Sequence, residues 1–368
     1  NIDLFAKDFK LPQVFKASFA VDQKLPLGFM FTADITYNDN ISAITYENIN
    51  LKDPTVFTTG SDVRPRYNGQ RVDNVYQGVY LASNTSEGSA WNTSFTISKL
   101  FKSEKIDATI QATYAYGEST VLFDATSSQN SSQWNNIETV NGSNAISGVS
   151  TSDFAQGNRI LGNGFINYKW NKSLKTKLGV FYEGAEGTPI SYVYNDNGRI
   201  LGDTFSNSAL IFVPANQSQI VLVNDPVTGL NAQQQWEALD AFIEGNEYLR
   251  SRRGDYAERN GDRLKWSHVI DLKFAQEFTL NVKQKRHTFE VSADIFNFTN
   301  LLNKDWGKRY FASFDQVQLL NQVGFLPDGT TPTFRYNPSV EGSYNQIDDA
   351  GLNSSRWQMQ IGLRYTFN

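Results

Sequence analysis

Charged side chains gather between residues 250 and 263. Guanidinium groups pair with carboxylates and phosphates, so this cluster could hold an anionic ligand or a peptide, or bind lipopolysaccharide. Carboxylates of the same segment, such as Glu258 and Asp262, could instead neutralise the arginines in pairs that brace a loop, and the close opposite signs favour this alternative. The candidate ligand-binding residues are Arg250, Arg252, Arg253, Asp255, Arg259 and Arg263.

Few other residues could carry out catalysis or bind a metal. The two histidines, His268 and His287, fall near opposite ends of successive predicted strands. At ~3.3 Å per residue they lie roughly 30 Å or more apart, so they cannot form one site. The turn Asn195-Asp-Asn-Gly198 with Asp203 offers fewer carboxylates than calcium requires. Cysteine is absent, and no nucleophile elbow, P-loop or zinc signature occurs. We therefore expect no enzymatic activity, no cofactor and no metal.

Composition narrows the class of protein. The chain of 368 residues has a net charge of −5, which argues against a nucleic-acid partner. Aromatic residues make up 14% of it, yet its mean hydropathy is only −0.44. No apolar run reaches the ~18 residues that a transmembrane helix needs. This combination is typical of a membrane β-barrel, in which about half of each strand is polar.

The segment from Trp357 to Phe367 shows the clearest pattern in the chain. Large apolar residues alternate strictly with Gln358, Gln360, Gly362, Arg364 and Thr366, which predicts a β-strand with one apolar face. A soluble sandwich could contain such a strand. Aromatic residues at both ends of the apolar face favour a transmembrane barrel strand. The predicted lipid-facing residues are Trp357, Met359, Ile361, Leu363, Tyr365 and Phe367.

Similar alternation elsewhere predicts roughly nine strands, the first near 13–24 and the last at 354–367. Short connections alternate with long ones, as in outer-membrane barrels with periplasmic turns and external loops. We expect little regular sheet in 196–262 and 298–353, apart from a helix within 232–250. The short connections are about 25–28, 101–105, 171–173 and 281–286, and the long ones are 39–74, 118–157, 196–262 and 298–353.

An odd number of strands predicts an incomplete barrel. The first and last strands would run in the same direction and could not pair antiparallel, and an unpaired edge in hydrocarbon is costly. We therefore expect residues 1–368 to be the C-terminal part of a barrel whose N-terminal strands and plug are absent from this sequence. Strand 13–24 would pair with 28–38, and strand 354–367 with 287–297. Each of these two strands would have a further partner outside the sequence.

Several short motifs, taken in order, resemble one known family. They are similar to the barrel of Oar-like TonB-dependent receptors from Bacteroidetes-type bacteria, over nearly the whole chain. The resemblance implies a barrel of about 22 strands that houses a plug, and a periplasmic TonB-type energy transducer as partner. No plug or TonB-contact residue can be assigned here. The motifs are Leu11-Pro-Gln-Val-Phe-Lys16, Asn84-Thr-Ser-Glu-Gly88, Gly187-Thr-Pro-Ile-Ser-Tyr-Val-Tyr194, Ile211-Phe-Val-Pro214, Glu258-Arg-Asn-Gly261, Trp266-Ser-His-Val-Ile-Asp-Leu272, Asp294-Ile-Phe-Asn-Phe-Thr-Asn-Leu-Leu-Asn303 and Trp306-Gly307.

Two functions fit these expectations. The first is a transporter of the bacterial outer membrane, embedded in lipid and lipopolysaccharide, whose long loops capture a ligand for energised import. The second is a structural or scaffold barrel, a subunit of a larger envelope assembly whose loops contact other envelope proteins. An upstream plug and TonB box would favour the first function, and stable co-purification with envelope proteins would favour the second. The pattern does not identify the ligand.

Overall fold

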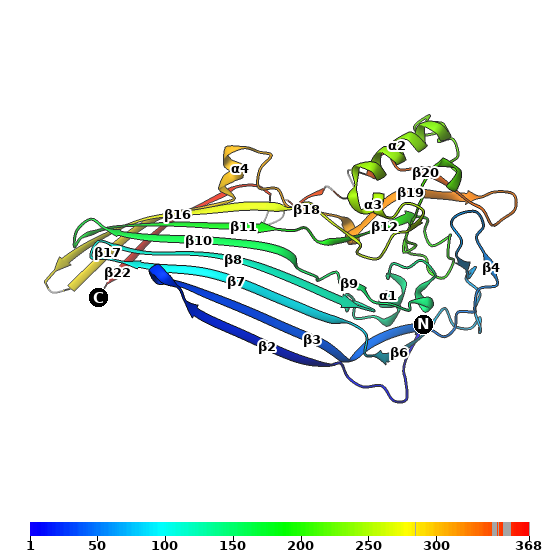
Figure 1. Ribbon diagram of the computed structural model, residues 1–368, viewed down its shortest axis with the longest axis horizontal. Helices are drawn as coiled ribbons and strands as arrows, with labels where there is room; N and C mark the ends of the chain where they lie inside the picture. Colours follow the sequence, from blue (N-terminus) through cyan, green and yellow to red (C-terminus); the bar gives the residue numbers. More distant parts are fainter. Residues whose placement is uncertain (284, 341–343, 345, 349–354, 368) are drawn as a thin grey trace.

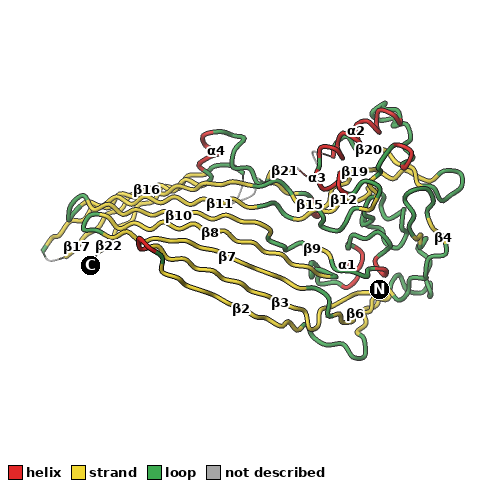
Figure 2. The backbone as a smooth tube through the Cα atoms, in the orientation of Figure 1, coloured by secondary structure: helices red, strands yellow, loops and turns green. Residues whose placement is uncertain are grey.

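The computed structural model describes residues 1–283, 285–340, 344, 346–348 and 355–367. One long antiparallel sheet runs along the length of the molecule, and a mixed assembly of short strands, helices and loops lies at one end of it (Figures 1 and 2). Each predicted strand overlaps a long strand of this sheet; in the last, 354–367, the strand begins only at Gln358, and residue 354 lies outside the described residues. The long strands are β2 (Gln13–Lys24), β3 (Phe29–Asn48), β7 (Ser89–Lys102), β8 (Ile106–Val121), β10 (Gly157–Lys169), β11 (Leu174–Ala185), β16 (Ser267–Val282), β17 (Lys285–Phe296) and β22 (Gln358–Phe367).

Each long strand pairs antiparallel with its neighbours in sequence, because short turns join strands in pairs and the period of two fixes their register. The predicted pairings of the first and last strands are confirmed: β2 pairs with β3, and β22 pairs with β17. Among the described residues no pairing joins β2 to β22. The expected partners outside the sequence, and the closure of a barrel, stay predictions.

The short connections lie where the sequence predicted them. The turn before β3 contains η1 (Pro26–Gly28), where Leu27 has a φ of 60°. The turns between β7 and β8 and between β10 and β11 also lie where predicted, and residue 284 of the last short turn is outside the described residues. The prediction that 39–48 begins a loop is wrong. This stretch extends β3, and its residues 43–48 pair with β6 (Val79–Thr85). Its mixed polarity hides the alternation.

The two faces of the sheet differ chemically. Cross-strand rows on one face are largely apolar and exposed, because residues directly opposite in register share a face. On the other face, Lys177 contacts Glu290 at 2.5 Å and Lys175 contacts Glu277 at 2.9 Å. One apolar row across five strands consists of Ile361, Ala293, Phe274, Leu178 and Ile166.

The assembly at the end of the sheet has a hydrophobic core of its own. Its buried apolar side chains come from residues 190–264 and 312–340. A four-stranded sheet in the order β15-β12-β19-β20 crosses this core, and two helices pack against it. The core elements are β12 (Pro189–Asn195), β13 (Phe212–Val213), α2 (Ala232–Gly245), α3 (Glu247–Ser251), β14 (Asp255–Tyr256), β15 (Asp262–Arg263), β19 (Gln316–Phe325) and β20 (Pro332–Tyr336).

These elements change the expectation for the long loops. The helix predicted within 232–250 is confirmed as α2 and α3, whose N-caps are Asn231 and Asn246. The prediction of little regular sheet is wrong for 298–353, which contains β19 and β20. Residues 341–343, 345 and 349–353 of that loop lie outside the described residues. The predicted solvated loop 118–157 also contains a fully buried aromatic residue, Trp134.

No helix in the described part of the chain has the length and apolarity needed to cross a membrane. The remaining elements are short. They are β1 (Ile2–Phe5), β4 (Val56–Phe57), β5 (Pro65–Arg66), α1 (Asn130–Asn135), η2 (Ser143–Ala145), β9 (Ser150–Thr151), η3 (Gln217–Gln219), α4 (Phe298–Leu302), β18 (Tyr310–Phe311), η4 (Ser313–Asp315) and β21 (Gln346–Ile347).

Candidate functional site

The candidate site is the folded assembly at the end of the long sheet, which we call the cap. It comprises residues 49–78, 122–156, 186–266 and 308–340, so four connections far apart in sequence meet there (Figure 1). Function commonly resides on loops held by a rigid scaffold, and here the long strands supply that scaffold. The cap is therefore the place where contacts with a ligand or partner can form.

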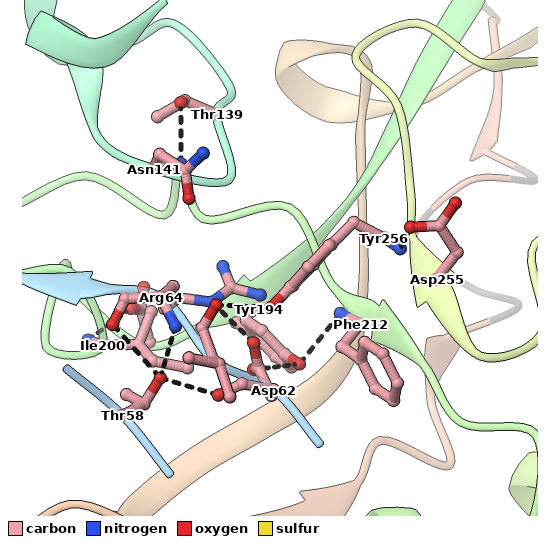
Figure 3. Close-up of polar contacts among 12 residues, drawn as sticks. Thr58, Asp62, Arg64, Thr139, Asn141, Tyr194, Ile200, Phe212, Asp255 and Tyr256 are labelled. Atoms are coloured by element: carbon pink, nitrogen blue, oxygen red, sulfur yellow. Dashed lines mark hydrogen bonds and ion pairs between the residues drawn. The ribbon is translucent and has the colours of Figure 1, made fainter. Parts of the chain in front are cut away.

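A buried arginine joins the first segment of the cap to the core. The Arg64 Nε donates to Asp62 at 2.7 Å, and its guanidinium lies 5.2 Å from the Tyr194 ring centre and 5.0 Å from that of Tyr256. Asp62 also accepts a hydrogen bond from the Tyr194 hydroxyl at 2.9 Å (Figure 3). Two aromatic rings and one carboxylate thus compensate a buried cation, whose Nη1 and Nη2 find no hydrogen-bond partner among the described residues. Burial raises the pKa of Tyr256 to about 12.

A second polar contact fixes the helices to the small sheet. Asp262 accepts from the Tyr192 hydroxyl and from the Asn246 amide, both at 2.8 Å. Asn246 also caps α3 by accepting from the Leu249 N–H, and its own backbone N–H donates to Ile243 at the end of α2, so one residue ends α2 and starts α3. Buried Tyr192 and the half-buried Asn246 and Asp262 are thus all hydrogen-bonded.

The predicted arginines do not converge on one point. Each contacts a different partner within the protein. Arg252 pairs with Asp255 and with the neighbouring Glu258, and Arg253 pairs with two carboxylates of α2. Arg250 and Arg263 donate to backbone carbonyls of different segments. These contacts fit the alternative in which the cluster braces a loop. Binding of an anion there stays a prediction.

Arg259 is the clearest bracing contact. Its side chain is buried and donates to the carbonyls of Val121 and Leu122, at the end of β8. It therefore ties the re-entry to β16 to a strand more than a hundred residues earlier. The sequence identified this residue by charge, but nothing local to it indicated the backbone it contacts.

The other chemically capable residues are used locally. His287 lies opposite Leu280 in the β16–β17 register, twelve residues from His268, which is about 40 Å along a strand. His268 contacts Tyr182, and His287 contacts Tyr365. The predicted separation of the histidines is therefore confirmed. No group of three histidines or acids placed to hold a metal occurs among the described residues.

The six predicted lipid-facing residues are all exposed, with Ile361 at 71% and Leu363 at 83%. Trp357 lies just before β22. The other five stand opposite Ile295, Ala293, Val291, Phe289 and His287 of β17, so they continue the face that is largely apolar. Contact with lipid itself stays a prediction.

A cavity of about 580 Å³ opens within the cap. Two tight turns contribute to its lining. Asn68-Gly69 and Asn197-Gly198 both have positive φ at their two central residues, and each turn is closed by a backbone hydrogen bond of 3.2 Å. This is the type I′ geometry that Asn-Gly pairs favour. The sequence analysis treated 195–198 only as a weak acidic turn and missed the cavity. The repeated Asn-Gly pair was the available signal.

Comparisons with known proteins are sparse. No protein-family model and no curated protein matches the chain. Among solved structures the chain is similar to the outer membrane transporter YddB from Escherichia coli, with a TM-score of 0.42 and 13% identity over 98% of this chain. The match covers 34% of the transporter, so the chain spans about a third of its length. A similarity this low does not establish a shared fold, and the resemblance to Oar-like receptors stays a prediction.

Proposed function

We propose that this chain is part of a transporter barrel in the bacterial outer membrane, with the cap outside the cell. One observation carries the proposal: a long antiparallel sheet exposes a largely apolar face along all its strands, while its other face carries ion pairs. An exposed apolar surface of this extent needs a cover, and lipid covers every strand of such a sheet alike.

The strand lengths support this placement. The 16 residues of β16 extend about 50 Å at ~3.3 Å per residue, about twice the height of the apolar band of an outer-membrane barrel. The surplus carries the strands beyond the membrane, where they meet the cap. The short turns at the other end would then face the periplasm.

In this proposal the cap captures a ligand, and the barrel provides the path for its import. The polar face of the sheet would line the lumen and contact a plug, which an energised TonB-type transducer in the periplasm would move. The chain itself would carry out no bond chemistry. This part of the proposal rests on the family resemblance and on the four connections that converge in the cap.

Membrane fractionation tests the first step. We expect the full-length protein to sediment with outer membranes and to migrate faster on gels before heating than after, as folded barrels do. Cysteine placed at Gln233 of α2 should react with an impermeant reagent on intact cells. Labelling only after the outer membrane is opened would reverse the topology, and recovery in the soluble fraction would contradict the proposal.

A scaffold barrel remains the second candidate because the cap exposes large apolar side chains. Phe205 is 90% exposed, Phe314 is 91% exposed and Val227 is 88% exposed. Apolar groups in water are often protein contacts when they cluster. Cross-linking from these three positions on intact cells would favour the scaffold if it captures a defined envelope protein, and transport without such capture would remove this candidate.

A further inference from the structure

We propose that the cavity between the two Asn-Gly turns binds a small anionic solute rich in hydroxyl groups, such as a sugar acid or a sugar phosphate. This inference rests on the proposed capture role of the cap and names the ligand class for it. The volume of the cavity, about 580 Å³, lies within the ~300–1,000 Å³ range of small-molecule sites.

The cavity is held open by backbone contacts rather than by flexible side chains. The Tyr67 N–H donates to the Leu201 carbonyl and the Gly69 N–H to the Gly202 carbonyl, both at 2.7 Å. A Cβ at Gly202 would come within 2.8 Å of the Asn68 nitrogen, so the close approach of the two loops requires glycine there. The walls are thus set before a ligand arrives, which lowers the entropic cost of binding.

Two cations line this cavity. Arg71 is half-buried on a backbone bridge to Leu51, and Arg199 is exposed at the turn opposite. Neither guanidinium forms an ion pair within the described part of the chain. Burial raises the pKa of Tyr80, and the charge of Asp3 on β1 raises it further. The charge of Arg71 acts in the opposite direction, so this arginine lies near the phenol.

The carboxylate in the lining is already occupied. Asp203 accepts from the backbone N–H of Ser143 at 2.8 Å and from its neighbour Thr204 at 2.9 Å. Among its side chains the lining thus has two guanidinium groups and one carboxylate, and that carboxylate is bound by backbone N–H groups rather than by either arginine. A carboxylate or phosphate of the ligand would bind the arginines through charge-assisted hydrogen bonds.

Amide side chains around the cations explain the preference for hydroxyl groups. Asn68, Asn197 and Gln77 line the cavity, and their side chains make no hydrogen bond within the described residues. Each amide offers a donor and an acceptor side by side, which suits neighbouring hydroxyl groups. An aliphatic anion would make none of these hydrogen bonds, whereas a hydroxylated one would make them in addition to its contact with the cations. The exposed Phe205 ring also belongs to the lining and can cover the C–H face of a sugar.

Titration calorimetry on the full-length protein in detergent tests the inference with galacturonate, glucose 6-phosphate and glucose as probes. We expect at least one anion to bind about ten-fold or more tightly than glucose, with affinity falling as salt rises. Arg71→Gln should weaken anion binding about ten-fold, since a hydrogen bond to a charged group contributes that much. The double variant with Arg199→Gln should lose it. Arg335→Gln, on β20 and outside both the cavity lining and the 250–263 cluster, is the matched control and should bind like the parent.

Each outcome decides the inference. Binding of only one anion supports it and identifies whether the group is a carboxylate or a phosphate. Equal affinity for glucose, no binding of any probe at millimolar concentration, or unchanged affinity in a folded double variant would overturn it. Fractionation of the same preparations reports separately on the barrel. A soluble chain that still binds an anion would refute only the membrane proposal, and a membrane barrel that binds none would refute only the cavity.

Discussion

The cap and the long sheet place their apolar side chains in opposite ways. The hydrophobic core of the cap buries Leu239, Ile243 and Leu249 completely, whereas on the sheet Ile361 and Leu363 are more exposed than not. The cap thus buries its apolar side chains within its own fold. Those of the sheet are shielded from water only if an apolar surrounding covers them. Under the proposed function one chain would face both water and lipid, and a substitution should reveal which of the two its position faces.

The largest effect is expected at the buried ion pair of the cap. Arg64→Met should destabilise the cap by about 3–5 kcal/mol, because it leaves Asp62 buried without its cation. Hydrogen exchange of the 58–66 segment would measure the loss. Adding Asp62→Leu should restore part of the stability, since both charges are then gone. An equal loss in the double variant would show that packing, not charge, holds this contact.

The core of the cap should respond to a cavity almost as strongly. Leu239→Ala on α2 removes a fully buried side chain and should cost about 2–5 kcal/mol of cap stability. Exchange protection in α2 should fall while the heat-dependent gel shift of the barrel stays unchanged. Gln233→Ala, on the exposed side of the same helix, is the control and should have little effect. Joint loss of both regions would mean that cap and sheet unfold as one unit.

On the sheet a loss of stability of similar size is expected when a charge is introduced on the apolar face, not when a side chain is shortened. Ile361→Arg should cost about 2–4 kcal/mol in liposomes, because it places a guanidinium against lipid. Gln360→Arg should cost far less, since position 360 stands opposite Asp294 on the charged face. Denaturant unfolding in liposomes would compare the two. Similar penalties would remove the assigned orientation.

A smaller, pH-dependent effect is expected where the cap meets the loop after β8. Burial raises the pKa of Glu138 from its ordinary 4.5 to about 7, and Gln316 donates to it at 2.8 Å. The folded state therefore holds this proton to higher pH than the unfolded state, and stability falls as pH rises from about 4.5 through 7. At about 1.4 kcal/mol per pKa unit, we expect up to about 3 kcal/mol of loss. Glu138→Gln should flatten the profile, and an unchanged slope would assign it to other groups.

The sheet was predictable because its information is local. Strict alternation identified β22, and short turns such as 171–173 fixed which strands are neighbours. The cap was not predictable in this way. β12 pairs with β19 in parallel, Tyr192 opposite Val317, across more than a hundred residues. β12 is buried on both faces and so does not alternate, and two-residue strands such as β13 are too short to show a period. The contact of Arg64 with Tyr194 depends on a fold that only the whole chain specifies.

The parallel pairing of β12 with β19 also sets an order of events during synthesis. The central strand of the small sheet emerges by residue 195, but its partner begins only at residue 316. Until then the segment that carries α2 lacks the side of its core supplied by Val317, Leu319 and Leu320. Contacts this distant in sequence form late, since the closure of a long loop must precede them. The core of the cap can therefore be completed only after β19 is available, and a chain truncated before β19 should keep its first hairpins while its cap stays open to proteases.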